Sequence, residues 1–513
     1  MSIKRNTVAN FTGQIYKATI SIAMLPLYLH LLGEEAFGLV AFFSLLNSWL
    51  VLLSASLAPT LARQVAFARG RGDLGGRRFR KMLRSLEFIV LGIGLAIALL
   101  VWLGSGWLAT SWLTVKALSF AEVSYCIVLM GVMIGLAPGV ALYSSGIGSL
   151  ERQVWLNGFS ILFATLRFGA VYVLLRWVSN DVVHYFEYQL AVSMLELIII
   201  ARKFYNCQPV DTRKEDPGLA FSWSEIRSVL PFTMGIAYTS ILWVFMTQSD
   251  KLVLSHVLSL SDFGFFGIVV LLANGVLLFS GPINGAVLPR LTMLHSRGDN
   301  NEMLALYRTT TQFLTVIAFS VGGMLAIFPE LIIYALTGNR AAAEWGAPVL
   351  TWFALGNAIL VMVSMQYSLQ VVHGQVRMHV INTTINAIIQ VPVLVFVAFN
   401  YGALAVAKAW FVIRIVTFFI WPAIVHYKFA PGLHWKWMTY DVTLPALGSI
   451  LGLVFLKLFF GSSTTLLDSG SRIELLAVLC LSAIGVLIVG SLAASEVRVR
   501  GVEIVAGLRS RLS

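Results

Sequence analysis

The sequence predicts an all-α integral membrane protein with about 14 transmembrane helices. Hydrophobic residues make up 58% of the 513-residue chain, charged residues only 12%, and the mean hydropathy is +0.84. A soluble domain carries about 25% charged residues. A helix that crosses the hydrocarbon needs about 20 mostly apolar residues. The segments that satisfy this are 8–32, 37–60, 86–104, 120–143, 155–175, 184–201, 229–254, 262–288, 309–333, 347–370, 378–399, 403–426, 441–460 and 473–492.

Basic residues between these segments indicate the orientation. Most of the 36 Lys and Arg residues fall on one side, which the positive-inside rule makes cytoplasmic. Both termini are then cytoplasmic and the number of spans is even. The densest basic run, within residues 63–84, includes Arg77, Arg78, Arg80 and Lys81. In one interpretation, this run only sets the topology and contacts anionic lipid head groups. In the other, it also gathers an anionic substrate at a cytoplasmic entrance. No nucleic-acid-binding module is recognisable, so we expect no nucleic-acid partner.

The chain contains an internal repeat at a shift of 226 residues. His30 and Gly38 align with His256 and Gly264, and the Arg-Gly-Asp sequence at 71–73 aligns with that at 297–299. Six spans therefore repeat as the next six, and because six is even the two bundles are parallel repeats about the membrane normal. We expect an N-terminal six-helix bundle at 1–202, a cytoplasmic linker at 203–228, a C-terminal six-helix bundle at 229–430, and two additional transmembrane helices with a basic cytoplasmic tail at 431–513.

Polar residues recur at the helical period in three of the spans. They are Asn10, Gln14, Lys17 and Ser21 in the first span, Ser240 and Thr247 in the seventh, and Asn382, Asn386 and Gln390 in the eleventh. At the repeat shift, Gln14 aligns with Ser240 and Ser21 with Thr247. A polar stripe is costly in hydrocarbon unless it faces other helices or water. These stripes predict a water-filled cavity between the two bundles, as in a transporter.

Three cations form the deepest set inside the predicted spans. Lys17 and Arg167 are far from the span ends, Arg167 shares a face with Asn157, and Arg414 is in the twelfth span. Ionised groups at this depth are costly and are usually functional. A cationic cavity favours an anion, and the planar guanidinium suits phosphate in particular. Together with the amides and hydroxyls, these cations indicate a substrate that contains phosphate and sugars.

The remaining charged residues inside spans are open to two interpretations. Glu196, in helical series with Gln189 and Ser193, and the neighbours Asp250 and Lys251 are candidates for ion or proton coupling. Alternatively, Glu196 pairs with the cations that follow it on the same helix, and Asp250 and Lys251 form a pair at the outer interface.

Several segments resemble the polysaccharide transporter (Wzx-type oligosaccharide flippase) family of the MOP flippase superfamily. They are residues 10–14, 25–33, 36–38, 148–153 and 248–251, and the resemblance covers roughly residues 8–430. It implies two pseudo-symmetric six-helix bundles in a MATE-like V shape with alternating access. It also implies that the protein moves undecaprenyl-pyrophosphate-linked oligosaccharide across the bacterial inner membrane for the synthesis of O-antigen, capsule or exopolysaccharide. The implied partners are this substrate and membrane lipids, with other polysaccharide-assembly proteins as candidates.

Two other functions are alternatives. A cation-coupled multidrug or small-molecule exporter of the MATE type favours an acidic cavity, whereas the deep charges here are basic. A polymerase or ligase of the same pathway needs large external loops or paired carboxylates, and the external loops at 105–119 and 334–346 have neither. The sequence lacks a nucleotide-binding motif, and its three cysteines are scattered. We therefore expect no enzyme, no metal site and no cofactor apart from Na+ or H+ as a coupling ion.

Overall fold

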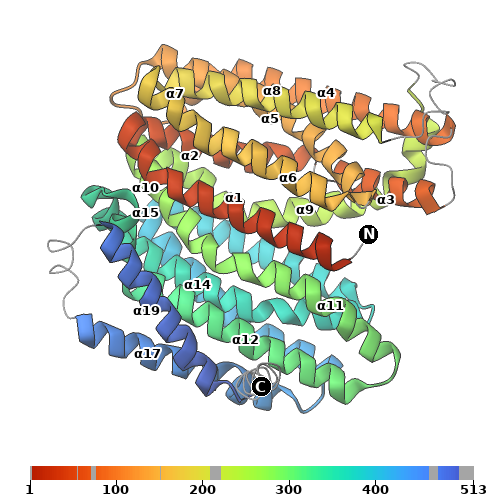
Figure 1. Cartoon of the computed structure of the whole chain (residues 1–513), viewed down its shortest axis with the longest axis vertical. Coiled ribbons are helices and arrows are strands. Elements are labelled where there is room, and N and C mark those ends of the chain that lie inside the picture. The colour runs from red at the N-terminus through yellow and green to blue at the C-terminus, as the bar shows by residue number, and fades with distance from the viewer. Residues whose placement is uncertain are drawn as a thin grey trace, which may run out of the picture. The chain divides into compact units, whose positions relative to one another are not determined.

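The computed structural model describes residues 3–54, 56–70, 77–150, 152–207, 221–460 and 472–495. In these ranges the regular structure is helical, apart from one isolated bridge between Thr114 and Ser259. The chain forms two compact units, Met1–Gly264 (unit 1) and Phe265–Ser513 (unit 2). Figure 1 shows long helices running alongside one another within each unit. The predicted all-α membrane class is confirmed, because many of these helices are long and apolar.

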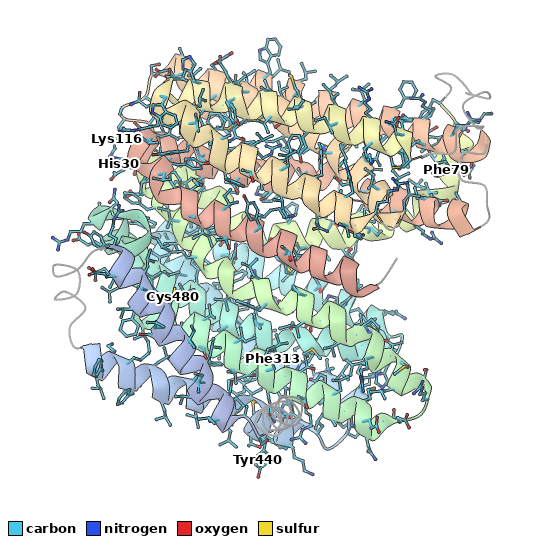
Figure 2. All side chains as sticks on the ribbon, viewed as in Figure 1. His30, Phe79, Lys116, Phe313, Tyr440 and Cys480 are labelled. Atoms are coloured by element: carbon cyan, nitrogen blue, oxygen red, sulfur yellow. The ribbon has the colours of Figure 1, made fainter. Side chains whose placement is uncertain are left out.

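Unit 1 contains the helices of the first sequence repeat and the first helix of the second. They are α1 (Ile3–Leu32), α2 (Glu34–Leu50), η1 (Val51–Ser54), α3 (Leu57–Gly70), α4 (Arg77–Trp107), η2 (Leu108–Trp112), α5 (Phe120–Ser149), α6 (Gln153–Ala164), η3 (Thr165–Ala170), α7 (Val171–Trp177), α8 (Val182–Asn206) and α9 (Trp223–Val257). Phe79, near the start of α4, and Lys116, just beyond η2, lie at opposite ends of the unit (Figure 2). The chain thus crosses the whole unit in one pass.

Unit 2 contains the rest of the second repeat and the two additional helices. Its elements are most of α10 (Leu260–Gly275), then η5 (Val276–Phe279), α11 (Ser280–Ser296), α12 (Asn300–Ile327), α13 (Pro329–Thr337), α14 (Arg340–Val372), α15 (Val376–Phe429), α16 (His434–Lys436), η6 (Trp437–Thr443), α17 (Leu444–Phe460) and α19 (Arg472–Ala493). The predicted domain boundaries rest on the sequence repeat, whereas the two units are defined by how the chain packs. The predicted boundaries therefore stay a prediction. Residues 208–220 of the predicted linker lie outside the described residues.

Local sequence explains where several helices begin. Ser119 and Glu122 form a reciprocal capping box at the start of α5, with N–H···O distances of 2.8 and 3.3 Å. The Asp181 carboxylate accepts from the Val183 N–H at the start of α8, at 2.9 Å. Asn339 caps α14 in the same way through the Ala342 N–H, also at 2.9 Å. These caps satisfy backbone donors that have no partner inside the helix.

Eleven helices among the described residues are long and apolar enough to cross a membrane. One of them, 377–429, is interrupted at Gly402, whose backbone has φ 74° and ψ −169°. Glycine adopts such a backbone without the steric penalty of a side chain, so α15 comprises two segments there. This agrees with separate predicted spans at 378–399 and 403–426. The total of fourteen spans stays a prediction, because α2 and α9 are not among the eleven.

Close helix contacts depend on small residues. In unit 1, a Cβ on Gly94 of α4 would lie 2.3 Å from the Gly135 carbonyl oxygen of α5, so only glycine fits at this crossing. In unit 2, the additional helices α17 and α19 pack against each other, where a Cβ on Gly448 would lie 2.4 Å from the Ala493 Cβ. The same hairpin packs on α12, and a Cβ on Gly323 would meet Leu453 at 2.3 Å. The two C-terminal helices are therefore an integral part of unit 2.

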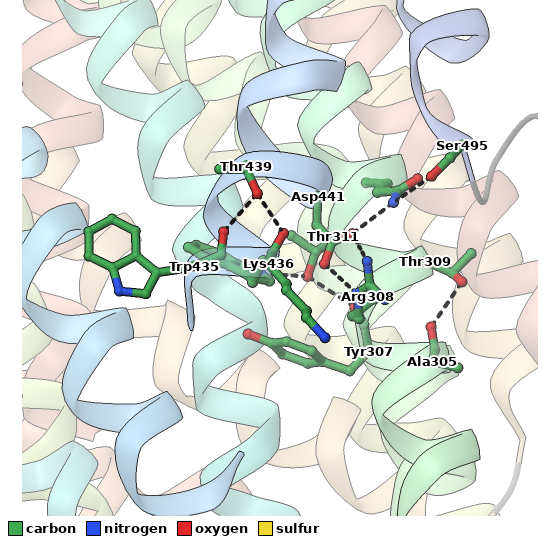
Figure 3. A network of polar contacts seen from close by, with 12 residues as sticks. Ala305, Tyr307, Arg308, Thr309, Thr311, Trp435, Lys436, Thr439, Asp441 and Ser495 are labelled. Carbon is green, nitrogen blue, oxygen red and sulfur yellow. Dashed lines mark hydrogen bonds and ion pairs between the residues drawn. The ribbon is translucent and has the colours of Figure 1, made fainter. Parts of the chain in front are cut away.

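An ion pair with a buried carboxylate attaches this hairpin to the unit (Figure 3). The Arg308 guanidinium of α12 donates to both carboxylate oxygens of Asp441 in η6, at 2.8 and 3.1 Å. Gln312 donates to the same carboxylate at 2.8 Å, and Asp441 is fully buried. Three charge-assisted or amide hydrogen bonds thus compensate for the removal of the carboxylate from water.

Candidate functional site

A π-helical turn, η3, interrupts the predicted fifth span between α6 and α7. A π turn shifts the backbone hydrogen bonds by one residue, and such turns are frequent at functional sites. Side chains of α1 and α8 bind its carbonyl groups. The Tyr188 hydroxyl donates to the Leu166 oxygen at 2.9 Å, the Gln189 amide donates to the Arg167 oxygen at 2.8 Å, and the Tyr28 hydroxyl donates to the Phe168 oxygen at 2.5 Å. These bonds hold the turn, and therefore the Arg167 backbone, in place.

The Arg167 side chain is directed to α8. Its Nη2 lies 2.6 Å from Oε2 of Glu196 and donates to the Ser193 hydroxyl at 3.2 Å. The side chains of Arg167 and Glu196 are 26% and 16% exposed, so this ion pair is mostly but not fully buried. A partly desolvated, charge-assisted hydrogen bond of this length is strong. The structure thus brings together two of the predicted site residues.

The sequence suggested another partner for Glu196, the cations that follow it on α8. The structure places Arg167 of η3 at its carboxylate instead. Lys203, one of those cations, has its Nζ 5.1 Å above the ring of Trp155. Arg167 lies within the π turn, so the regular helical period does not give its direction, and a π turn has no clear signature in the sequence.

Helix α1 packs against α6 and η3 and carries the other deep cation of unit 1. The Tyr16 hydroxyl lies 2.7 Å from the Thr165 hydroxyl. Gly13 is so close to Asn157 that a Cβ would lie 2.5 Å from its Oδ1. Asn157, predicted on the cavity face, therefore lies against the α1 backbone, and its amide also donates to the Gln153 carbonyl oxygen at 2.8 Å.

The predicted polar stripe of α1 is only partly covered by protein. Gln14 and Lys17 are exposed and Ser21 is half-buried. The side chain of Asn10 lies outside the described set. An exposed ammonium within an apolar segment requires water or a counter-charge. Lys17 is thus available to an anion, whereas Arg167 already holds one.

Together, we call these residues the η3 cluster: Tyr16, Tyr28, Thr165, Arg167, Gln189, Ser193 and Glu196. The sequence predicted Arg167, Glu196 and their polar neighbours on α8. It missed the two tyrosines of α1 and Thr165, because isolated tyrosines are common in membrane helices and nothing in the sequence indicates that they meet a π turn.

The predicted residues of α9 are also in unit 1. Ser240 and Lys251 are half-buried, and Asp250 is 1% exposed. The Thr247 hydroxyl donates to the Trp243 carbonyl oxygen at 2.8 Å, and the Lys251 ammonium donates to the carbonyl oxygen of Thr247. Lys251 thus satisfies part of its hydrogen bonding on its own helix.

The predicted residues of unit 2 lie on α15. The Asn386 amide donates to the backbone and side-chain oxygens of Asn382, both at 3.0 Å, and Gln390 is 1% exposed. Arg414 is buried, and its Cζ lies 4.0 Å above the ring of Trp410. Stacking on an aromatic face stabilises a guanidinium away from water.

The predicted cytoplasmic basic entrance is at the start of α4. Arg80 is 9% exposed and Lys81 is half-buried. The side chains of Arg77 and Arg78 lie outside the described set.

One turn further along α4 is a cluster that the sequence did not predict. Glu87 accepts from the Tyr143 hydroxyl at 2.8 Å and from the Tyr205 hydroxyl, and it pairs with Arg84 at 3.3 Å.

The sequence over residues 3–295 matches the family described as polysaccharide biosynthesis protein. The chain belongs to this family. Its fold is similar to that of the lipid II flippase MurJ in an inward closed conformation, with a TM-score of 0.71 and 14% identity over 96% of this chain and 98% of MurJ. No curated protein matches the sequence.

Transporters of the MOP superfamily share the fold as well. An inward-facing multidrug resistance MATE transporter matches with a TM-score of 0.65 and 13% identity, over 82% of this chain and 98% of the transporter. A MOP superfamily transporter from Pyrococcus furiosus, described as having a binding pocket of reverse polarity, matches with a TM-score of 0.55 and 14% identity, over 82% and 95% of the two chains. The family predicted from the sequence is confirmed, and the chain is a multi-pass membrane protein with the MOP-type fold.

Proposed function

We propose that this protein is a flippase that moves an undecaprenyl-pyrophosphate-linked oligosaccharide from the cytoplasmic to the periplasmic leaflet of the bacterial inner membrane. Membership of the polysaccharide biosynthesis family supports a role in glycan assembly. The single structural observation that carries the phosphate assignment is Arg167, a guanidinium fixed on a π turn and 26% exposed inside a membrane span. A cation in this setting favours an anionic head group.

The substrate would be divided among three environments. Its polyprenyl tail stays in the bilayer, because transfer of each CH₂ group to water costs about 0.8 kcal/mol. The pyrophosphate binds Arg167 and the exposed ammonium of Lys17, with Arg414 as a further candidate. The glycan binds amides and hydroxyls, for which the candidates are Gln14, Ser21, Ser240, Thr247, Asn382, Asn386 and Gln390.

Transport then requires alternating access and a source of free energy. Both termini lie in the cytoplasm in this proposal, and residues 203–228 link the two moving repeats. A ligand or ion shifts the equilibrium between two states only through its different affinity for them. The membrane potential supplies about 2.3 kcal/mol per elementary charge per 100 mV, which is enough to drive a charged head group. Asp250 and Glu196 are the candidate carriers of a coupling Na+ or H+.

A drug exporter of the MATE type is the second candidate, favoured by the MATE-like fold. The two functions differ in the charge of the cargo, because the exposed ammonium of Lys17 would repel a cationic drug.

Deletion of the gene tests the proposal. We expect undecaprenyl-linked glycan to accumulate in the cytoplasmic leaflet and surface polysaccharide to fall, with both restored by the wild-type gene. An unchanged leaflet distribution, together with greater sensitivity to cationic drugs, would instead identify an exporter.

A further inference from the structure

The position that a phosphate needs at Arg167 is occupied by a carboxylate of the protein. Oε2 of Glu196 lies 2.6 Å from Nη2 of Arg167. Carboxylate and phosphate oxygens bind a guanidinium with the same geometry, so both compete for the same N–H groups. Ser193 also accepts from Nη2, so both hydrogens of this nitrogen are used. Each bidentate edge of a guanidinium includes Nη2, so a phosphate that binds with two oxygens has to displace one of these acceptors, of which Glu196 is the charged one.

If a phosphate displaces Glu196 from Arg167, the Glu196 carboxylate is left in an unfavourable environment. Its side chain is 16% exposed, and it would lose its counter-ion while a second anion arrives beside it. Desolvation and a nearby like charge both favour the neutral form of a carboxylic acid. A proton on Oε2 removes the repulsion and also allows the group to donate a hydrogen bond to the incoming oxygen.

Among the residues that the structure describes, several titratable groups surround α8, and Arg167 forms the ion pair with the Glu196 carboxylate. The elements packed around α8 carry Glu122, Tyr125, Cys126 and Tyr143 on α5, Tyr172 and Arg176 on α7, and Tyr28 on α1. Tyr28 contacts α8 through the ring of Tyr185, and Tyr125 through the carboxylate of Glu187. Arg176 is exposed.

We propose that Glu196 holds Arg167 in the empty transporter and takes up one proton when a lipid diphosphate replaces it. This inference rests on the proposed function. The guanidinium–carboxylate bond breaks, a guanidinium–phosphate bond forms, and one proton passes from water to Oε2, while Arg167 stays protonated. Release of the lipid reverses each step. One proton therefore moves outward with each substrate and offsets one of its negative charges. The membrane potential then acts on the remaining net charge, and in this scheme the proton itself supplies no driving force.

The test uses the full-length protein in lipid nanodiscs, with undecaprenyl diphosphate as the probe and undecaprenol as the ligand without phosphate. The infrared difference spectrum of the bound minus the free state reports a protonated carboxylic acid by its carbonyl stretch. The affinity is measured against pH over a range in which the ionisation of the diphosphate is constant. Glu196→Gln removes the proposed proton acceptor. Glu187→Gln is the matched control on the same helix, where the carboxylate is exposed.

We expect the carbonyl band in the wild type and in Glu187→Gln, and its loss in Glu196→Gln. Because binding takes up one proton, the affinity for undecaprenyl diphosphate should fall by up to about tenfold for each unit rise in pH. Glu196→Gln should bind at least as tightly as the wild type, with little pH dependence, because the competing carboxylate is gone.

Three results would overturn the inference. Saturable diphosphate binding without the band, or with a band that persists in Glu196→Gln, refutes proton uptake by Glu196 and leaves the flippase proposal standing. Equal binding of undecaprenyl diphosphate and undecaprenol by the wild type refutes the phosphate site and the flippase assignment with it. If Glu196→Gln does not fold, Glu196→Asp takes its place, and a carbonyl band that is unchanged from the wild type refutes its assignment to Glu196.

Discussion

The guanidinium of Arg308 binds both carboxylate oxygens of Asp441, and this pair joins α12 to the first of the two additional helices. Asp441→Ala removes the hydrogen bonds to a charged group and leaves Arg308, whose side chain is 28% exposed, to water. We expect this variant to lower the free energy of unfolding by about 1.5–3 kcal/mol, measured by thermal unfolding of the purified protein. Lys436→Ala, on the same short segment but exposed, is the control. Equal unfolding temperatures for the two variants would show that the pair does not attach the hairpin.

The contact between Gly13 and Asn157 predicts a size limit at the α1–α6 interface. A Cβ at residue 13 would lie 2.5 Å from Asn157 Oδ1 and 3.3 Å from its Cβ, so in Gly13→Ala the Asn157 side chain or the helix that carries it must shift. Overpacking of this kind costs about 1–3 kcal/mol. Gly158→Ala is the control, because its Cβ would meet open space. The double variant Gly13→Ala/Asn157→Ala should recover most of the lost stability, and no recovery would contradict the assigned contact.

The hydroxyl of Tyr28 supports the π turn from α1. Tyr28→Phe removes the hydrogen bond to the Phe168 carbonyl while keeping the ring, at a cost of about 1 kcal/mol. We expect a small fall in unfolding temperature but a larger fall in transport, because the position of Arg167 depends on this turn. Tyr427→Phe, at an exposed tyrosine, should change neither quantity. Normal transport by Tyr28→Phe would mean that the turn needs no support from α1.

The two deep cations of unit 1 should matter for transport rather than for protein level. A hydrogen bond to a charged group contributes about 1.5–3 kcal/mol, so Lys17→Ala should slow flipping by roughly tenfold to a hundredfold. Lys17→Arg keeps the charge and should be milder. Arg176→Ala, an exposed cation on α7, is the control. Complementation of a deletion strain measures transport, and immunoblotting measures the protein level. Full complementation by Lys17→Ala would show that Lys17 is not part of the substrate site.

The sequence was sufficient to predict the fold class, because hydropathy and helical periodicity are local properties. Each predicted span overlaps helical segments of the structure, although 37–60 covers α2, η1 and the start of α3, and 309–333 runs from α12 into α13. The predicted boundary between 378–399 and 403–426 coincides with the break in α15 at Gly402. The family was also predictable, since the resemblance rested on contiguous segments that the family match at residues 3–295 includes.

The candidate site was only partly predictable, because it depends on contacts between helices. Arg167 and Glu196 could each be identified as costly charges inside spans, but their pairing depends on a π turn that the sequence does not reveal. The tyrosines that hold this turn come from α1 and α8, far from it in sequence. Helical periodicity placed Asn157 on a polar face, whereas the close packing at Gly13 determines what it contacts.

The most direct test of the account is transport by purified protein in proteoliposomes that contain a fluorescent undecaprenyl-diphosphate-linked saccharide in both leaflets. A membrane-impermeant quencher reports the fraction of label in the outer leaflet over time. We predict that the wild type makes the inner-leaflet label accessible and that Arg167→Ala is slower by roughly tenfold or more, as expected from loss of a charge-assisted contact. Accessibility equal to that of protein-free liposomes, or equal rates for the wild type and Arg167→Ala, would contradict the assignment of Arg167 as the phosphate-binding cation of a flippase.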